Sequence, residues 1–306
     1  MEMKHKLKGL TDQLNTVIVG KPDAITDCVT CLLAAGHLLI EDIPGVGKTT
    51  LAHALARSLG LQFNRVQFTA DLMPSDITGV TVYERHKEGF VFHPGPIFTQ
   101  VLLADEINRA SPKSQSALLE AMEEHQVTVE GQSHTLPSPF FVLATQNPYD
   151  QLGTHALPAS QLDRFLMCIS LGYPDRSAER ELLFGQDRRA LVASLPCQLP
   201  PQALLELQTQ VQTIYVSAAL MDYLQNLMAA TRNGRWFVQG LSPRAGLAVL
   251  RAARARALIG GRDFVTPDDI QSILPQTIAH RLTPVQSAGR TPREQVRAMV
   301  DSLELA

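Results

Sequence analysis

The chain has 306 residues with a formal net charge of −3 at pH 7, and 45% of its residues are apolar. This length allows two domains with separate cores, and the charge excludes the overall basic excess that is typical of nucleic-acid-binding proteins. The amino terminus lacks the apolar segment of a secretory signal. The most apolar stretch, residues 28–40, is about 13 residues long and too short to span a membrane. We therefore expect a cytoplasmic protein without membrane insertion.

Two cysteines lie in a segment that we expect to be an apolar helix. Cys28 and Cys31 are three positions apart, so a helix would place them about one turn apart on the same face. A C-x-x-C pair could indicate metal or redox chemistry, but this pair lies in a predicted apolar helix, and the sequence contains no second pair of cysteines or histidines at ligand spacing. We expect both thiols in the apolar core.

A phosphate-binding loop follows, between a predicted strand at residues 37–41 and a predicted helix at residues 50–60. Its glycines suit a tight turn with exposed backbone N–H groups, which bind phosphate at the start of a helix. Its first position is Asp42, where the usual G-x-x-x-x-G-K-[ST] pattern has glycine, and Lys48 is expected to reach the β- and γ-phosphates. The residues expected to bind the nucleotide are Gly45, Val46, Gly47, Lys48, Thr49 and Thr50.

The next chemical signal is a predicted strand at residues 101–104, which is followed by Asp105 and Glu106. Its four residues are all apolar, as expected for a strand that is covered on both faces. Ligands of parallel α/β sheets bind at the carboxyl ends of the strands, so both acids are expected at the nucleotide. Asp105 and the Thr49 hydroxyl are predicted to hold Mg²⁺, and Glu106 is predicted to activate the attacking water.

The two parts of the chain have different periodicities. Strands and helices alternate from about residue 17 to 171, which predicts an α/β fold with a parallel sheet covered by helices on both faces. From residue 203 onward the periodicity is helical throughout, which predicts a small all-helical domain. We therefore expect a nucleotide-binding core at residues 1–175, a linker region at residues 176–202 and a helical domain at residues 203–306.

Three long segments resemble the MoxR family of AAA+ ATPases: residues 74–98, 105–124 and 144–165. The similarity extends in order from about Val17 to the end of the chain. It implies a P-loop AAA+ core followed by a helical lid, with ATP and Mg²⁺ as ligands. The family's sheet has the strand order 5-1-4-3-2, which the sequence pattern itself does not specify. The resemblance also implies an insertion in the second helix at about residues 74–98 and a hairpin before sensor 1 at about residues 127–139.

The resemblance implies roles for single residues as well. Val19 and the two residues before it match the segment that packs against adenine, and Asn147 matches the sensor 1 residue that places the water. Arg164 matches an arginine finger that reaches the ATP of the neighbouring subunit. Arg244 matches the sensor 2 arginine of the lid, acting in cis or in trans. Arg109 lies in the family-like run DEINRA, where a salt bridge at the subunit boundary is expected.

The function implied by the resemblance is that of an ATP-hydrolysing chaperone. It would form a homo-oligomeric ring, expected to be a hexamer, and would remodel, mature or activate client protein complexes with a partner that carries a von Willebrand A domain. A magnesium-chelatase-like subunit and an AAA+ nucleic-acid motor are the alternatives, and the net charge of −3 makes nucleic acid the less favoured partner. A nucleotide-binding scaffold without turnover conflicts with the complete catalytic set.

Overall fold

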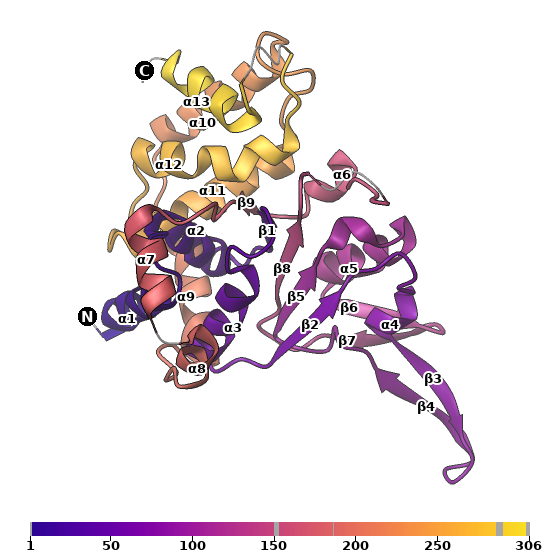
Figure 1. The fold of residues 1–306 in the computed structure, drawn as a ribbon. Helices are drawn as coiled ribbons and strands as arrows, with labels where there is room; N and C mark the ends of the chain where they lie inside the picture. Colours follow the sequence, from indigo (N-terminus) through magenta and orange to yellow (C-terminus); the bar gives the residue numbers. More distant parts are fainter. Residues whose placement is uncertain (1, 150–152, 186, 286–289, 304–306) are drawn as a thin grey trace.

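The computed structural model describes residues 2–149, 153–185, 187–285 and 290–303. At its centre is a parallel sheet of five strands in the order β2-β5-β8-β1-β9 (Figure 1). These strands are β1 (Leu38–Glu41), β2 (Phe63–Gln67), β5 (Val101–Asp105), β8 (Phe141–Gln146) and β9 (Met167–Ile169). If these five strands are numbered 1 to 5 in chain order and read from the β9 edge, their order is 5-1-4-3-2, which is the order of the family's sheet. The predicted fold class is confirmed.

Alternate residues of the strands point into two apolar cores, one on each face of the sheet. On β1, Leu38 and Ile40 belong to the first core, whereas Leu39 belongs to the second. Because both faces are covered, residues 101–104 are fully buried, as their apolar sequence predicts. The first core is covered by α1 (Glu2–Val17), α2 (Pro22–Leu33) and α3 (Lys48–Leu59), and the second by α4 (Pro74–Thr78) and α5 (Pro112–Glu124).

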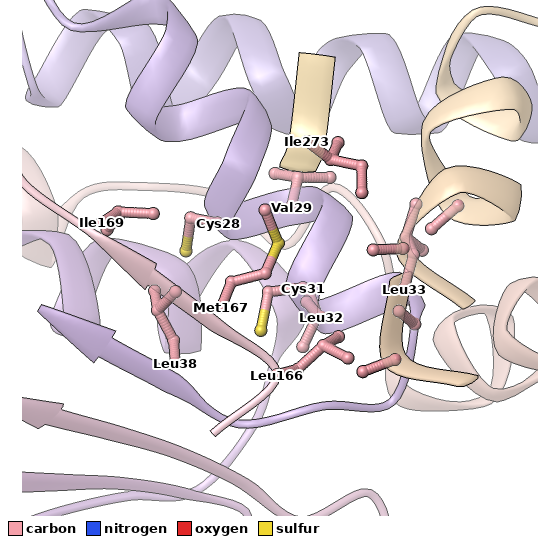
Figure 2. Packing of buried hydrophobic residues seen from close by; sticks show 14 of the residues in the cluster. Cys28, Val29, Cys31, Leu32, Leu33, Leu38, Leu166, Met167, Ile169 and Ile273 are labelled. Atoms are coloured by element: carbon pink, nitrogen blue, oxygen red, sulfur yellow. The ribbon is translucent and has the colours of Figure 1, made fainter. Parts of the chain in front are cut away.

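The first core continues without interruption into the helical lid. Figure 2 shows Cys28 and Val29 of α2 close to Met167 of β9 and Ile273 of the lid. Cys28 and Cys31 are 0% exposed, and burial raises the pKa of Cys28 to about 12, so the predicted core placement of both is confirmed. The lid contains α10 (Ala218–Arg232), α11 (Pro243–Ile259), α12 (Pro267–Ile278) and α13 (Pro292–Asp301), and α9 (Pro201–Thr213) packs against both α2 and α11.

The remaining helices are short. α6 (Ala159–Leu162) precedes β9, whereas α7 (Arg176–Phe184) and α8 (Arg188–Ala193) lie in the region expected to be a linker. Since α8 packs against α3, part of that region lies beside the helix that follows the phosphate loop. Within the described ranges, no helix has both the length and the apolar character that a membrane crossing requires.

Two hairpins extend the α/β core, both where the sequence predicts insertions. The hairpin of β3 (Gly79–Glu84) and β4 (Gly89–Pro94) projects from the body of the molecule, and β6 (Gln126–Val129) and β7 (Gln132–Thr135) form the other (Figure 1). Phe92 stacks on His134 with ring centroids 3.9 Å apart, so the projecting hairpin rests on the second one. Gly79 has φ +96°, and a Cβ there would lie 2.3 Å from the carbonyl oxygen of His93, so this crossing requires glycine.

Candidate functional site

The carboxyl edge of the sheet contains a cavity of about 700 Å³. The glycine-rich loop follows β1, the two acids come at the end of β5, and Asn147 follows β8. Three parts of the site that are predicted separately from the sequence are therefore brought together, at the edge where parallel sheets bind ligands. The residues that line the cavity are Pro44, Gly45, Gly47, Lys48, Thr49, Thr50, Arg65, Gln67, Asp105, Glu106, Arg109 and Asn147.

The glycine-rich loop leads directly into α3. Gly45 has φ +84° and Gly47 has φ +99°, a left-handed backbone that glycine adopts without steric cost. Lys48 is the first residue of α3, and its Nζ donates hydrogen bonds to the carbonyl oxygens of Asp42 (2.8 Å) and Ile43 (3.0 Å). These contacts place a positive charge beside a helix start, where the first backbone N–H groups have no intrahelical acceptor. The loop is therefore suited to a polyphosphate anion.

Asp42, which replaces the usual first glycine of the motif, fastens the loop to the segment after β9. Its side chain is buried, and its Oδ2 accepts hydrogen bonds from the backbone N–H groups of Leu171 (2.6 Å) and Gly172 (2.7 Å). Its Oδ1 accepts a hydrogen bond from the N–H of Ile43 (2.9 Å). The carboxylate thus satisfies donors of two separate segments, which a glycine could not do. The departure from the usual motif ties the phosphate loop to the chain that leads toward the lid.

Asp42→Gly, which restores the usual first residue of the motif, is expected to lower the free energy of unfolding by about 2–4 kcal/mol, because it leaves the buried N–H of Leu171 and the partly buried N–H of Gly172 without an acceptor. Asp42→Asn keeps one acceptor oxygen and is expected to lose less. Urea unfolding followed by circular dichroism measures both values. A glycine variant as stable as the wild type would show that this tie does not stabilise the fold.

Asp105 is held by side chains from the strands on either side of β5. Its Oδ1 accepts a hydrogen bond from the hydroxyl of Thr145 (2.5 Å), and its Oδ2 forms an ion pair with Nη2 of Arg65 (2.7 Å). The hydroxyl of Thr49 lines the same cavity. Carboxylate and hydroxyl oxygens are the hard ligands that Mg²⁺ prefers, so Asp105 and Thr49 fit the metal that the sequence predicts.

Glu106 stands at the end of β5 with a backbone φ of +56°, a conformation that is uncommon outside glycine. Its N–H donates a hydrogen bond to the hydroxyl of Thr145 (2.9 Å). Its Oε2 accepts a hydrogen bond from Nε2 of Gln67 (2.8 Å) and forms an ion pair with Nε of Arg109 (3.0 Å). Arg109 therefore contacts the predicted catalytic acid of its own chain, and the salt bridge expected for it at a subunit boundary stays a prediction.

Arg65, Gln67 and Thr145 are site residues that the sequence does not single out. Their roles depend on strand register, since the parallel pairing of β2 with β5 sets Gln67 beside Asp105. The one available signal is the polar alternation of β2, in which Arg65 and Gln67 are two positions apart and share a face. That pattern is also typical of an ordinary edge strand, and β2 is indeed at the edge of the sheet.

The apolar turn predicted to pack against adenine lies next to the phosphate loop. The Cδ1 of Ile18 is 3.5 Å from the position that a Cβ of Gly47 would occupy. Val17 and Ile18 are buried, whereas Val19 is half-buried. Neither Val19 nor Val46 is among the lining residues of the cavity, and Val46 packs against the first core. Contact of Val19 and Val46 with the nucleotide stays a prediction.

The two predicted arginines, Arg164 and Arg244, do not line this cavity. Both form ion pairs with the carboxylate of Glu123, in the last turn of α5: Nε of Arg164 is 3.2 Å from Oε2, and Nη1 of Arg244 is 2.8 Å from Oε1. Arg164 precedes β9, so this cluster lies at the amino edge of the sheet. β1 has four residues, and strands of this length separate the two edges by roughly 10–15 Å.

The arginine cluster carries an excess of positive charge. Asp163 forms an ion pair with Arg281, whose Nε is 3.3 Å from Oδ1. Burial lowers the pKa of Arg281 to about 10, and the charge of Asp163 opposes this shift. Together with Arg251, four arginines and two carboxylates line a cavity of about 140 Å³, which leaves two positive charges in excess (four minus two). The lining of this cavity therefore favours the approach of an anion.

Comparisons with known proteins agree with this geometry. Residues 37–167 match the ATPase family associated with various cellular activities (AAA), and residues 229–302 match the AAA lid domain. Chaperone MoxR1 of Mycobacterium tuberculosis is 40% identical over 295 residues, covering 91% of this chain and 76% of that protein. The uncharacterized protein YeaC of Bacillus subtilis is 46% identical over 279 residues, covering 91% of this chain and 87% of that protein. A crystal structure of a candidate ATPase from Cytophaga hutchinsonii has a TM-score of 0.88 and 34% identity, covering 99% of this chain and 95% of that chain. The chain therefore belongs to the MoxR family of AAA+ ATPases.

Proposed function

We propose that the chain is a chaperone that hydrolyses ATP in sites shared between adjacent copies of a hexameric ring. The observation that carries this proposal is the separation of the site residues into two groups. The phosphate loop, the acids and Asn147 line a cavity at one edge of the sheet, whereas Arg164 and Arg244 lie together at the opposite edge. Phosphoryl transfer needs positive charge close to the transferring group, whose oxygens are negatively charged, and an arginine from a neighbouring chain can supply it. Head-to-tail contact between copies would join the two edges.

Each residue of the cavity has a distinct part in this proposal. Lys48 and the loop N–H groups bind the β- and γ-phosphates. Thr49 and Asp105 would hold Mg²⁺, which neutralises developing charge when it is bound. Glu106 takes a proton from the attacking water, and the Asn147 amide positions that water near the γ-phosphate. The chemistry is mainly positioning and charge stabilisation, which these side chains suffice to provide.

Mixing two inactive variants tests whether the site is shared. Lys48→Ala removes the phosphate contact but keeps the arginines, and Arg164→Ala does the reverse. Mixed rings contain some sites with a complete set, so phosphate release is expected to recover to about a quarter of the wild-type rate at equal mixing. Lys48→Ala mixed with the Lys48→Ala, Arg164→Ala double variant is the control and should stay inactive. Absence of recovery at every ratio, in samples shown to contain mixed oligomers, would contradict the shared site.

The ring itself is tested by light scattering after size-exclusion chromatography. A hexamer is expected in the presence of ATP, because the nucleotide would lie between copies and link them. If the measured molar mass equals that of a single chain, with ATP bound and at the protein concentration of the hydrolysis assay, the ring is ruled out. The same measurement on Arg164→Ala shows whether that variant still assembles, which the mixing experiment requires.

The projecting hairpin of β3 and β4 is the part that we expect to contact the client protein. It exposes apolar side chains far from the core, among them Tyr83 (53% exposed) and Phe90 (75%), whose rings lie 5.4 Å apart. Exposed apolar surface of this kind is typical of protein contacts. In the proposed function, the client complex is remodelled, matured or activated together with a von Willebrand A-domain partner.

A pull-down from cells of the source organism tests the client role of the hairpin. The tagged wild type and the Tyr83→Ser, Phe90→Ser variant are compared, with bound proteins identified by mass spectrometry. The variant is expected to lose client proteins while its basal ATP hydrolysis stays unchanged, because the hairpin is not part of the phosphate cavity. Equal recovery of every bound protein by both chains would contradict this role.

A further inference from the structure

Among the described residues, Glu123 is the side chain that forms ion pairs with both Arg164 and Arg244. We infer that Glu123 is a positioning residue, which holds these two arginines as a pair aimed at the ATP of the next copy of the chain. This inference rests on the shared site proposed above. It adds to that site a residue that would touch neither the nucleotide nor the metal.

The geometry leaves Arg164 able to bind a second anion with both of its terminal nitrogens. Each oxygen of the Glu123 carboxylate takes one arginine, Oε2 that of the core and Oε1 that of the lid. Arg164 is paired through Nε, and its two terminal nitrogens donate no hydrogen bond to any residue that the structure describes. The terminal nitrogens are the edge that binds phosphate oxygens in pairs. The Arg164 and Arg244 side chains are 29% and 49% exposed, so both remain accessible to a neighbour.

The positions of these charges are unfavourable for the helices that carry them, so the local stability of α5 and α11 does not explain them. Glu123 lies in the last turn of α5, where the helix dipole disfavours a negative charge, and Arg244 lies in the first turn of α11, where it disfavours a positive one. Ion pairs as exposed as these contribute little to stability. A carboxylate at this point does have an electrostatic role, because without it four arginines would face Asp163 alone and would repel one another.

The same carboxylate also links the two domains. Arg164 belongs to the α/β core, and Arg244 belongs to the lid. The two arginines are therefore held by the same carboxylate only while the lid is in the position that the structure shows. Asp163 supports this arrangement, because its Oδ2 lies 3.9 Å from Nε of Arg244 and its Oδ1 pairs with the buried Arg281 of the lid. Glu123 thus sets the distance between Arg164 and Arg244, which neither domain could set alone.

Glu123→Gln tests the inference, because glutamine keeps an acceptor for one arginine and turns an N–H₂ group toward the other. The kcat for ATP hydrolysis is expected to fall by about 10- to 100-fold, the effect of misplacing a group at a reacting centre. The KM for ATP is expected to change by less than about threefold, because ATP is held in the cavity of its own chain. The matched control is Glu124→Gln, on the same helix. Glu124 is exposed and forms no ion pair with another residue in the described ranges.

Mixing with Lys48→Ala distinguishes positioning from simple docking of the lid. Glu123→Gln rings keep their phosphate loops, so arginines from Lys48→Ala neighbours are expected to restore hydrolysis as they do for Arg164→Ala. If Arg164→Ala recovers and Glu123→Gln does not, Glu123 is needed for the ATP site of its own chain, and the inference fails while the shared site stands. A kcat equal to that of Glu124→Gln would also overturn it. If neither variant recovers, the shared site itself is wrong.

Discussion

Glu106→Gln is expected to lower kcat for ATP hydrolysis by about 10²–10⁴-fold, the contribution of a general base, while ATP still binds. Glutamine has the shape of glutamate but cannot take a proton from water. The fold should tolerate the change, since Glu106 is at the end of a strand and its side chain faces the cavity. The substitution removes the ion pair between Glu106 and Arg109. The side chain of Arg109 is 47% exposed, so water can still solvate it.

Two measurements check this expectation. Phosphate release under saturating ATP gives kcat, and calorimetric titration with ATP and Mg²⁺ gives the dissociation constant. Glu124→Gln serves as the control for replacing one carboxylate by an amide. If Glu106→Gln hydrolyses ATP as fast as the wild type, Glu106 is not the group that activates the water.

Arg164→Ala is expected to have the largest effect on the chemical step, a loss of about 10³–10⁵-fold in kcat, as found for arginine fingers in other systems. Its effect on ATP affinity should be small, because Arg164 is not among the residues that line the phosphate cavity of its own chain. Arg164→Lys keeps the charge but lacks the planar fork of five donors, and it should recover only part of the rate.

The comparison of Arg164→Ala with Lys48→Ala makes this prediction specific. Lys48→Ala should weaken ATP binding directly, since Lys48 lies in the loop at the start of α3. Titration of both variants with ATP separates the two effects. An Arg164→Ala variant that loses ATP affinity as strongly as Lys48→Ala would place Arg164 in the cavity of its own chain and would contradict the assignment in trans.

The sequence predicts the parts of the site that short segments define. Lys48, Thr49 and the acids of β5 lie in segments whose chemistry and neighbouring elements can be identified locally, and the structure brings them to one cavity. The role proposed for Asn147 required the family resemblance, since an Asn-Pro sequence is also typical of a turn. The fold class followed from periodicity, whereas the strand order did not, because hydrophobic patterns carry no information about which strands are neighbours.

The remaining contacts could not be predicted because they join segments that are distant in the sequence. Asp42 is seen only as a departure from a motif until the structure shows its hydrogen bonds to residues 171 and 172. The pairing of Arg65 with Asp105 depends on strand register. Glu123 is one of several acids at the end of α5, and its two arginines come from points about 40 and 120 residues further along the chain, so only tertiary packing identifies it.

The separation of the two edges also has a consequence for genetics. In the proposed ring, a copy without Lys48 would inactivate one site, whereas a copy without both Lys48 and Arg164 would inactivate its own site and that of its neighbour. In a cell that makes equal amounts of wild-type and altered chains, about half of the sites would survive the single change but only about a quarter the double one. Dominance would therefore depend on whether an allele damages one edge of the subunit or both.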